Sequence, residues 1–401
     1  MPKAISLPRG RLAGVACLLA LGITSAAAAK PDSAAEAKSD SRPDPRSRGF
    51  LVTYFMPSMI SAGKDTCPQG LNTDPKETYI AGLAPAERAK ARLLPTQTLY
   101  DLSSRSRDGI DLCGNPEAGP DPGFFTMQGS GTAPGMDLDG ARPGESAPGT
   151  CAHQPFANGV DNQLLRAMGC VAGYQADDQF ESAHLFSLRD GSMTYLVEIT
   201  GIDDVRNDDA VEVGLYASPD RPAYAGTNAK DTTSSRGVAL RHASLDVTAD
   251  PKYRQVLKGR ITDGVLTTEP AEIRLPHVYR PFIDTDYVIH AGRLRAEFQP
   301  DGSLKGMLAG YYDLTWFYDV VGTLEGRPHG TSNPRNLDIS YNFHCAGMYH
   351  ALHRLADGNP DPATGKCTSL SAAFPLEAVP AFVIHPQDAD PQQTADQRAA
   401  R

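Results

Sequence analysis

Hydrophobic and polar residues alternate most regularly along residues 286–312. Residues 293–298 read Arg-Leu-Arg-Ala-Glu-Phe, so every second side chain is apolar, and the next four residues read Gln-Pro-Asp-Gly. A period of two is typical of a strand that buries one face, and Pro, Asp and Gly favour a turn. This segment therefore predicts a β-hairpin.

Similar alternation marks further strands along the chain. The segments are 49–56, 182–189, 193–199, 211–217, 253–261 and 271–275. Short strands at this spacing, separated by turns rich in Gly, Pro and Asp, favour antiparallel architectures over a parallel α/β sheet. We predict a mainly β protein, an antiparallel β-sandwich or jelly-roll-like domain with a few short helices and disulfide cross-links.

Three segments have helical patterns instead. Residues 85–94 begin with Pro and contain good helix formers, 161–168 begin with an acid and are followed by Gly, and 345–356 place apolar residues on one stripe. Pro at the start, an acidic N-cap and a following Gly are typical helix boundaries. We predict three helices there.

The first residues resemble an export signal. Lys3, Arg9 and Arg11 precede an apolar run at 12–23, which ends in the small residues of 24–29. The run is shorter than the about 18 residues that a spanning helix needs, so we predict cleavage rather than an uncleaved anchor. The mature chain is then periplasmic or secreted and has no membrane span.

Composition predicts the rest of the domain organisation. Residues 30–48 and 386–401 have little to bury and are predicted to be a disordered leader and tail. Residues 49–113 form the N-terminal part of the folded region, 114–150 a Gly/Pro-rich linker or long loop, and 151–385 a β-rich domain.

Six cysteines remain after signal cleavage, an even number typical of disulfides in an exported protein. They are Cys67, Cys113, Cys151, Cys170, Cys345 and Cys367. Sequence does not determine their connectivity, and we take nearest-neighbour pairing as the working prediction: Cys67 with Cys113, Cys151 with Cys170, and Cys345 with Cys367.

The net charge of the chain makes some classes of binding partner less favourable than others. The chain has 48 acidic residues against 38 Lys and Arg, a formal net charge of -10. An acidic protein lacks the clustered cations that displace counterions from phosphate backbones, which disfavours nucleic acid and anionic lipid. Glycans, proteins and small molecules remain as partners.

An acidic loop separates two predicted strands and carries many oxygen donors within seven residues. They are Asp203, Asp204, Asn207, Asp208 and Asp209. Such oxygens can coordinate Ca²⁺, so the loop is a calcium candidate. The alternative is a solvated turn in which these side chains accept hydrogen bonds from nearby backbone N–H groups.

A second acidic turn resembles half of an EF-hand loop. Asp357, Asn359 and Asp361 match the first three ligand positions, but Pro362 and Thr368 stand where Gly and Glu are required. A helix stop followed by a turn explains these residues more simply.

Histidines offer a transition-metal hypothesis. His350 and His353 lie one turn apart in a predicted helix and could share a metal with a third ligand from elsewhere. Packing or hydrogen bonding is the alternative, since no H-E-x-x-H motif accompanies the pair.

Aromatic residues at strand spacing offer a ligand-binding hypothesis. Tyr312, Trp316 and Tyr318 would share one face of a strand, where they could stack on sugars if exposed or form part of the core if buried.

No hydrolase signature such as G-x-S-x-G occurs, and the sequence matches no family that we recognise. These patterns favour an exported, non-catalytic binding or surface protein, with calcium as its cofactor candidate. The alternative is an extracytoplasmic hydrolase that uses a metal or paired carboxylates.

Overall fold

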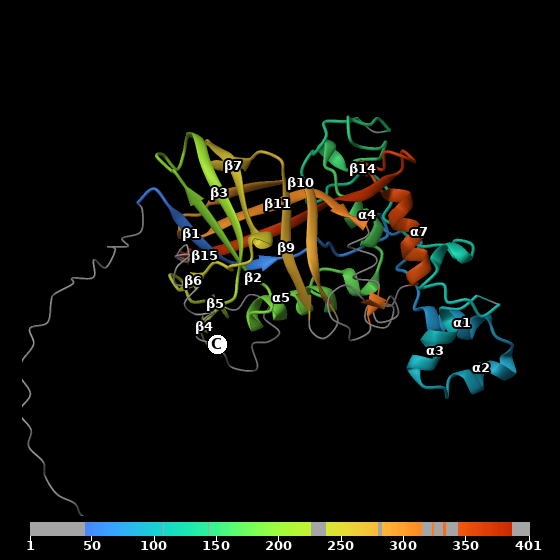
Figure 1. Cartoon of the computed structure of the whole chain (residues 1–401). Coiled ribbons are helices and arrows are strands. Elements are labelled where there is room, and N and C mark those ends of the chain that lie inside the picture. Colours follow the sequence, from blue (N-terminus) through green and yellow to red (C-terminus); the bar gives the residue numbers. More distant parts are fainter. Residues whose placement is uncertain are drawn as a thin grey trace, which may run out of the picture. The chain divides into compact units, whose positions relative to one another are not determined.

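A closed β-barrel forms the centre of the protein (Figure 1). The structure, a computed structural model, describes residues 45–106, 108–142, 144–225, 238–279, 283–314, 323–324, 332–333 and 344–386. Eight antiparallel strands pair in chain order, and the last also pairs with the first, which closes the barrel. They are β1 (Arg48–Phe55), β2 (Thr194–Thr200), β3 (Asp208–Ser218), β7 (Arg254–Thr262), β8 (Val265–Thr268), β10 (Ile283–Phe298), β11 (Leu304–Asp313) and β15 (Cys367–Ile384).

Further strands extend or flank the barrel. β14 (Gly358–Pro360) and β6 (Ser244–Asp246) pair with β15, and β9 (Ala271–Tyr279) pairs with β10. Two small two-stranded sheets are formed by β4 (Tyr224–Ala225) with β5 (Val238–Ala239), and by β12 (Thr323–Leu324) with β13 (Ser332–Asn333).

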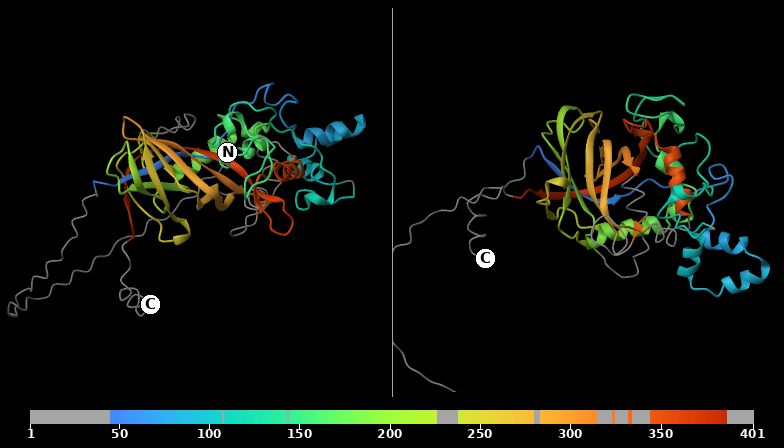
Figure 2. Two further views of the ribbon diagram at one scale, coloured as in Figure 1. Left: turned by 90° about the horizontal axis from the view of Figure 1, so that it is seen from above. Right: turned by 45° about the vertical axis from the view of Figure 1, so that its right-hand side comes forward.

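The described helices lie outside the barrel wall, as the two views of Figure 2 show. The α-helices are α1 (Pro75–Gly82), α2 (Pro85–Ala91), α3 (Thr96–Ser103), α4 (Gln163–Met168), α5 (Gln179–Asp190) and α7 (Cys345–Leu355). Short 3₁₀ turns are η1 (Pro116–Ala118), η2 (Ala157–Gly159), η3 (Ala172–Tyr174) and η5 (Pro251–Tyr253). None of the described helices has the length and apolarity that crossing a membrane requires.

The predicted sandwich or jelly-roll is wrong, because the sheet closes on itself. Alternation reports only that one face of each strand is buried, and it is the same in a sandwich and in a barrel. The difference is the pairing of β15 with both β11 and β1. Nothing in the local pattern of 49–56 indicates a partner more than 300 residues later.

Most individual strand predictions are confirmed. The predicted hairpin is β10 and β11, and the two alternating segments near residues 193–217 pair as β2 and β3. The predicted helices correspond to α2, α4 and α7. The strand predicted at 182–189 is wrong, since these residues belong to α5. There Phe180, His184 and Leu188 are buried at helical spacing, whereas Phe186 is exposed.

Strand β15 was missing from the sequence prediction although it is the longest in the barrel. It contains Pro375 and Pro380, and proline usually argues against an inner strand because it has no N–H for the ladder. Its inward-facing residues, such as Leu370 and Phe374, alternate with small outward residues. The two prolines hid this alternation.

Aromatic side chains fill the inside of the barrel. Phe374 stacks on Phe55 at 5.3 Å between ring centroids, and Tyr287 and Tyr312 both pack edge-on against it. One cavity inside the barrel, lined by Phe55, Leu294 and Leu308 among others, has a volume of only about 10 Å³. An eight-stranded barrel is narrow enough for side chains to fill, and aromatic and aliphatic residues occupy the interior here.

The six cysteines form three disulfides, as predicted, but the nearest-neighbour pairing is wrong. The bonds join Cys67 to Cys170, Cys113 to Cys345 and Cys151 to Cys367. Loops far apart in sequence meet on the outside of the barrel, and the cross-links follow this tertiary proximity. Three disulfides indicate an oxidising, extracytoplasmic environment.

Within the predicted linker or long loop 114–150, the side chains of Phe124, Met127 and Leu138 are buried. The signal peptide, most of the leader and all but Pro386 of the predicted tail lie outside the described residues.

Candidate metal centre

A polar cluster lies on the outer face of strands β11 and β15. Because side chains alternate across a strand, the inward positions Tyr312 and Leu370 leave Tyr311, Ser369 and Ser371 facing outward. The loop 136–161 covers this face, as Leu138 packs against Tyr311. The same loop pairs with β14 through a bridge between Thr150 and Gly358.

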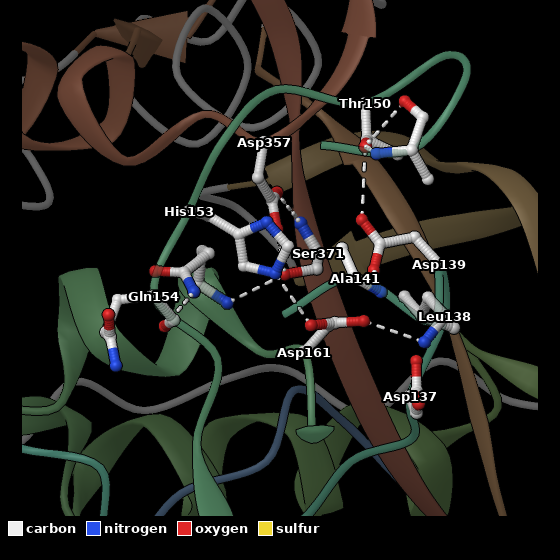
Figure 3. Close-up of polar contacts among 12 residues, drawn as sticks. Asp137, Leu138, Asp139, Ala141, Thr150, His153, Gln154, Asp161, Asp357 and Ser371 are labelled. Carbon is white, nitrogen blue, oxygen red and sulfur yellow. Dashed lines mark hydrogen bonds and ion pairs between the residues drawn. The ribbon is translucent and has the colours of Figure 1, made fainter. Parts of the chain in front are cut away.

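Three potential metal ligands converge in this cluster. One ligand atom each from Asp139, His153 and Asp161 lies within 4.8 Å of the other two. It is the one such group of His, Cys, Asp and Glu found among the residues that the structure describes. Figure 3 shows these side chains together with Asp357 and Ser371.

The His153 ring is held between a backbone carbonyl and a carboxylate. Its Nδ1 lies 3.2 Å from the Cys151 carbonyl oxygen, and its Nε2 lies 2.7 Å from Asp161 Oδ1. A carbonyl oxygen only accepts, so we assign the proton to Nδ1, and Nε2 is the atom that faces Asp161. A backbone carbonyl on the far nitrogen is the arrangement that orients metal-ligating histidines.

The carboxylates around His153 favour the protonated form of its ring when no metal is bound. The side chains of His153 and Asp161 are only 4% and 2% exposed. Burial acts to lower the pKa of His153, but the hydrogen bond to Asp161, the charge of Asp357 and the Cys151 carbonyl outweigh it and raise the pKa to about 9. A metal ion at Nε2 must therefore displace a proton.

Backbone and hydroxyl donors of the covering loop fix the two carboxylates. Asp161 Oδ2 accepts a hydrogen bond from the Leu138 N–H at 2.7 Å. Asp139 accepts one from the Ala141 N–H at 2.7 Å and one from the Thr150 hydroxyl at 3.1 Å. Each carboxylate therefore keeps a fixed orientation, and its remaining lone pairs are available to a cation.

Asp357 forms the inner layer of the cluster. It is fully buried, and its carboxylate accepts bonds from the Ser371 N–H and hydroxyl, each at 2.6 Å. The Ser371 oxygen in turn accepts the Gln163 N–H at the start of α4. Burial raises the pKa of Asp357 to about 7, although both Ser371 bonds and His153 act to lower it.

Two hydroxyls on the same face have no hydrogen-bond partner among the described residues. They are the phenol of Tyr311, a residue 7% exposed, and the hydroxyl of Ser369. Burial raises the pKa of Tyr311, and the charges of Asp357, Asp139 and Asp161 raise it further, so the phenol lies near all three carboxylates. A buried polar atom without a partner is unusual and is explained when a ligand or ion supplies one.

These donors suit a borderline divalent cation. One imidazole nitrogen with two carboxylate oxygens matches the ligands of Zn²⁺ and related first-row metals, whereas Ca²⁺ prefers oxygen alone.

The acidic loop at 203–209 is an exposed turn. Asp208 accepts the N–H groups of Asp203 and Ala210, Asn207 accepts the N–H of Asp263, and Asp203 forms an ion pair with Arg46. These are the local bonds expected of a solvated turn. Calcium binding at this loop stays a prediction.

The two histidines of α7 make separate contacts. His350 Nε2 lies 3.2 Å from the Pro116 carbonyl oxygen, and His353 Nδ1 lies 2.9 Å from the Tyr349 carbonyl oxygen. Both rings therefore have backbone partners, and neither residue belongs to the group of converging ligands. Their role as transition-metal ligands stays a prediction.

Tyr312 lies inside the barrel and is 1% exposed, in keeping with the alternative that it is a core residue. Trp316 and Tyr318 lie outside the described residues.

The sequence analysis missed Asp139, His153 and Asp161. They are spread over the 23 residues 139–161, which begin in the Gly/Pro-rich segment and end at a predicted helix, with none of the regular spacing that marks a helical or strand-borne metal site. The one available signal was a histidine two residues after Cys151, because a disulfide can fix a neighbouring ligand.

The chain matches no known protein-family model, no curated protein and no solved structure.

Proposed function

We propose that this chain is an exported, periplasmic or secreted protein that binds a divalent transition-metal ion, with zinc as the first candidate, through Asp139, His153 and Asp161. The observation that carries the proposal is the convergence of one nitrogen and two oxygen donors within 4.8 Å on a disulfide-bound face. The acidic net charge also favours cations over nucleic acid as ligands.

Burial supports a binding role over a catalytic one. A catalytic zinc keeps one coordination position open to water and substrate. Here the side chains of His153 and Asp161 are nearly inaccessible, and the loop 136–161 covers the site. An ion held there would cross-link three parts of this covering loop to one another, which is a structural or storage role rather than hydrolysis.

The site would bind metal more tightly as the pH rises. Because the pKa of His153 is raised to about 9, binding at neutral pH releases the Nε2 proton. Below that pKa, each unit of pH changes the affinity by about tenfold for one released proton.

Zinc titration of the metal-free mature chain by calorimetry tests the proposal. We expect one zinc per chain in the wild type and a loss of affinity of more than about tenfold in His153→Gln and in Asp161→Asn. His350→Gln is the matched control, since it removes a histidine outside the cluster and should leave the affinity unchanged. Undiminished binding in both cluster variants, or no binding in the wild type, would refute the proposal.

A further inference from the structure

A second site lies away from the barrel wall, where α1 and α3 face the start of α7. A cavity of about 840 Å³ is bounded there by Tyr79 and Leu83 of the α1 region, Leu102 at the end of α3, Phe125 of the loop after η1, and His344. Ligand pockets for small organic molecules have volumes of this order and similar mixed, mainly apolar walls.

The walls of this cavity are fixed in place. Asn72 donates two hydrogen bonds, to the carbonyl oxygens of Phe125 and Cys170, and accepts one from the Phe125 N–H. The disulfides Cys67–Cys170 and Cys113–Cys345 flank the lining segments in sequence. A cavity held by cross-links and hydrogen bonds loses little conformational entropy when a ligand enters.

The charge of the lining is unusual for an acidic protein. Among the described residues that line the cavity there is no Asp or Glu, and Arg105 is the one permanently charged side chain. Burial lowers the pKa of His344, so this histidine is neutral at pH 7. The nearby Lys76 is already paired with Asp74.

Arg105 can bind an anion without leaving its present position. One Nη1–H donates to the Gly109 carbonyl oxygen at 2.9 Å, which steadies the turn after α3. A guanidinium carries five N–H donors in a planar fork, so further donors remain for an anionic group.

Apolar side chains line part of the cavity. Leu102 is more than a third exposed, and Tyr79, Leu83 and Phe125 supply further apolar surface. Such a lining favours a ligand with an apolar body.

We infer that this cavity is a binding site for a small organic monoanion with an apolar body, whose charged group pairs with Arg105 and whose body packs between Tyr79, Leu83 and Phe125. The inference does not depend on the metal centre, because no residue is shared between the two sites.

The test uses two fluorescent probes of similar size, the anion anilinonaphthalene sulfonate and the neutral N-phenylnaphthylamine, with the full mature chain. We expect saturable binding of one sulfonate per chain. Arg105 is exposed, so Arg105→Gln should weaken sulfonate binding by about threefold to fivefold, as expected for an ion pair at the surface, and Arg105→Lys should retain most of the affinity. Neutral-probe binding should change less than about twofold in both variants, since no charge pairs with that probe.

A plugged variant locates the probe. A Cβ atom added at Gly82 meets no atom within 4 Å, and Gly82 lines the cavity, so we expect the indole of Gly82→Trp to occupy the cavity and abolish binding of both probes. Arg260→Gln, on the exposed face of β7, is the charge control and should leave both affinities unchanged. The inference would be overturned if Gly82→Trp still binds the sulfonate, or if the folded wild type does not bind it. It would also be overturned if Arg260→Gln weakens sulfonate binding as much as Arg105→Gln does.

Discussion

The barrel and the polar layer on its outer face are built in different ways. In the barrel, each strand pairs with its neighbour along the chain, and its inner side chains form one aromatic and aliphatic core. In the layer, Asp139, His153 and Asp161 come from an irregular loop that is held to the wall by β14 and by the disulfide Cys151–Cys367. The main hydrophobic core therefore lies in the barrel, whereas the candidate metal ligands lie in a layer fixed by cross-links and hydrogen bonds.

The largest expected effect comes from a substitution in the barrel core, which should lower stability without changing the polar layer. Phe374 is fully buried and contacts the rings of Phe55, Tyr287 and Tyr312, so Phe374→Ala leaves a cavity that should lower the free energy of unfolding by about 3–5 kcal/mol. Urea denaturation measures this change. At low temperature the variant should still bind one zinc per chain. A decrease in the free energy of unfolding of less than about 1 kcal/mol would show that the barrel repacks around the smaller side chain.

Removing the disulfide beside the site should affect both regions. Cys151→Ser with Cys367→Ser opens a link between residues 216 positions apart and should lower the free energy of unfolding by about 2–4 kcal/mol. Because the Cys151 carbonyl orients His153, zinc affinity should also fall by about tenfold or more.

The matched control for that variant is Cys67→Ser with Cys170→Ser. This pair also removes a disulfide, with a sequence separation of 103, but neither cysteine contacts His153. Denaturation should show a similar loss of stability, while calorimetry should show little change in zinc affinity. Equal losses of affinity in both double variants would mean that the disulfide acts only through global stability.

A pH titration should reveal the site in the metal-free protein. The pKa of His153 is raised to about 9 from an ordinary 6.5, so its stabilisation is fully present below pH 6.5 and is lost as the pH rises through 9. The pKa of Asp357 is raised to about 7, so the folded state binds the extra proton and loses stability as the pH rises from about 4 to 7.

In the variant His153→Gln, the loss of stability between pH 6.5 and 9 should disappear. Melting temperatures measured in a chelator should fall between pH 6.5 and 9 in the wild type and change less in the variant. The same slope in both proteins would contradict the raised pKa of His153.

The smallest effect is expected at the acidic turn before β3. Asp208→Asn weakens the acceptors of an exposed turn whose bonds are local, and the melting temperature should change least of the series. Melting with and without added calcium tests the calcium hypothesis directly. A calcium-dependent rise in the wild type that is lost in Asp208→Asn would support it.

The sequence predicted local structure well and tertiary arrangement poorly. The alternation at 293–298 and the Gln-Pro-Asp-Gly turn are local properties, and the hairpin β10–β11 follows from them. Closure of the barrel requires the pairing Leu51 with Val379, which no local pattern encodes. Proline at 375 and 380 also concealed the strand that makes this pairing.

The candidate site was missed for a related physical reason. Asp357 was interpreted as part of a helix-stopping turn, but the strand that follows brings Ser371 back beside it and buries both residues. His153 faces Asp161 because the loop between them reverses at η2. The conformation of the loops brings these side chains together, and the spacing of the residues along the chain does not predict that conformation.

If the chain is exported as proposed, its disulfide pattern affects the order in which the native bonds can form. Among the six paired cysteines, the three links join the first to the fourth, the second to the fifth and the third to the sixth, so every link crosses the other two in sequence. A chain that emerges from its N-terminus presents Cys67, Cys113 and Cys151 before any correct partner. Early oxidation can then form only wrong pairs, and the native set requires their later exchange. Secretion yield should therefore depend on a thiol–disulfide isomerase in the receiving compartment.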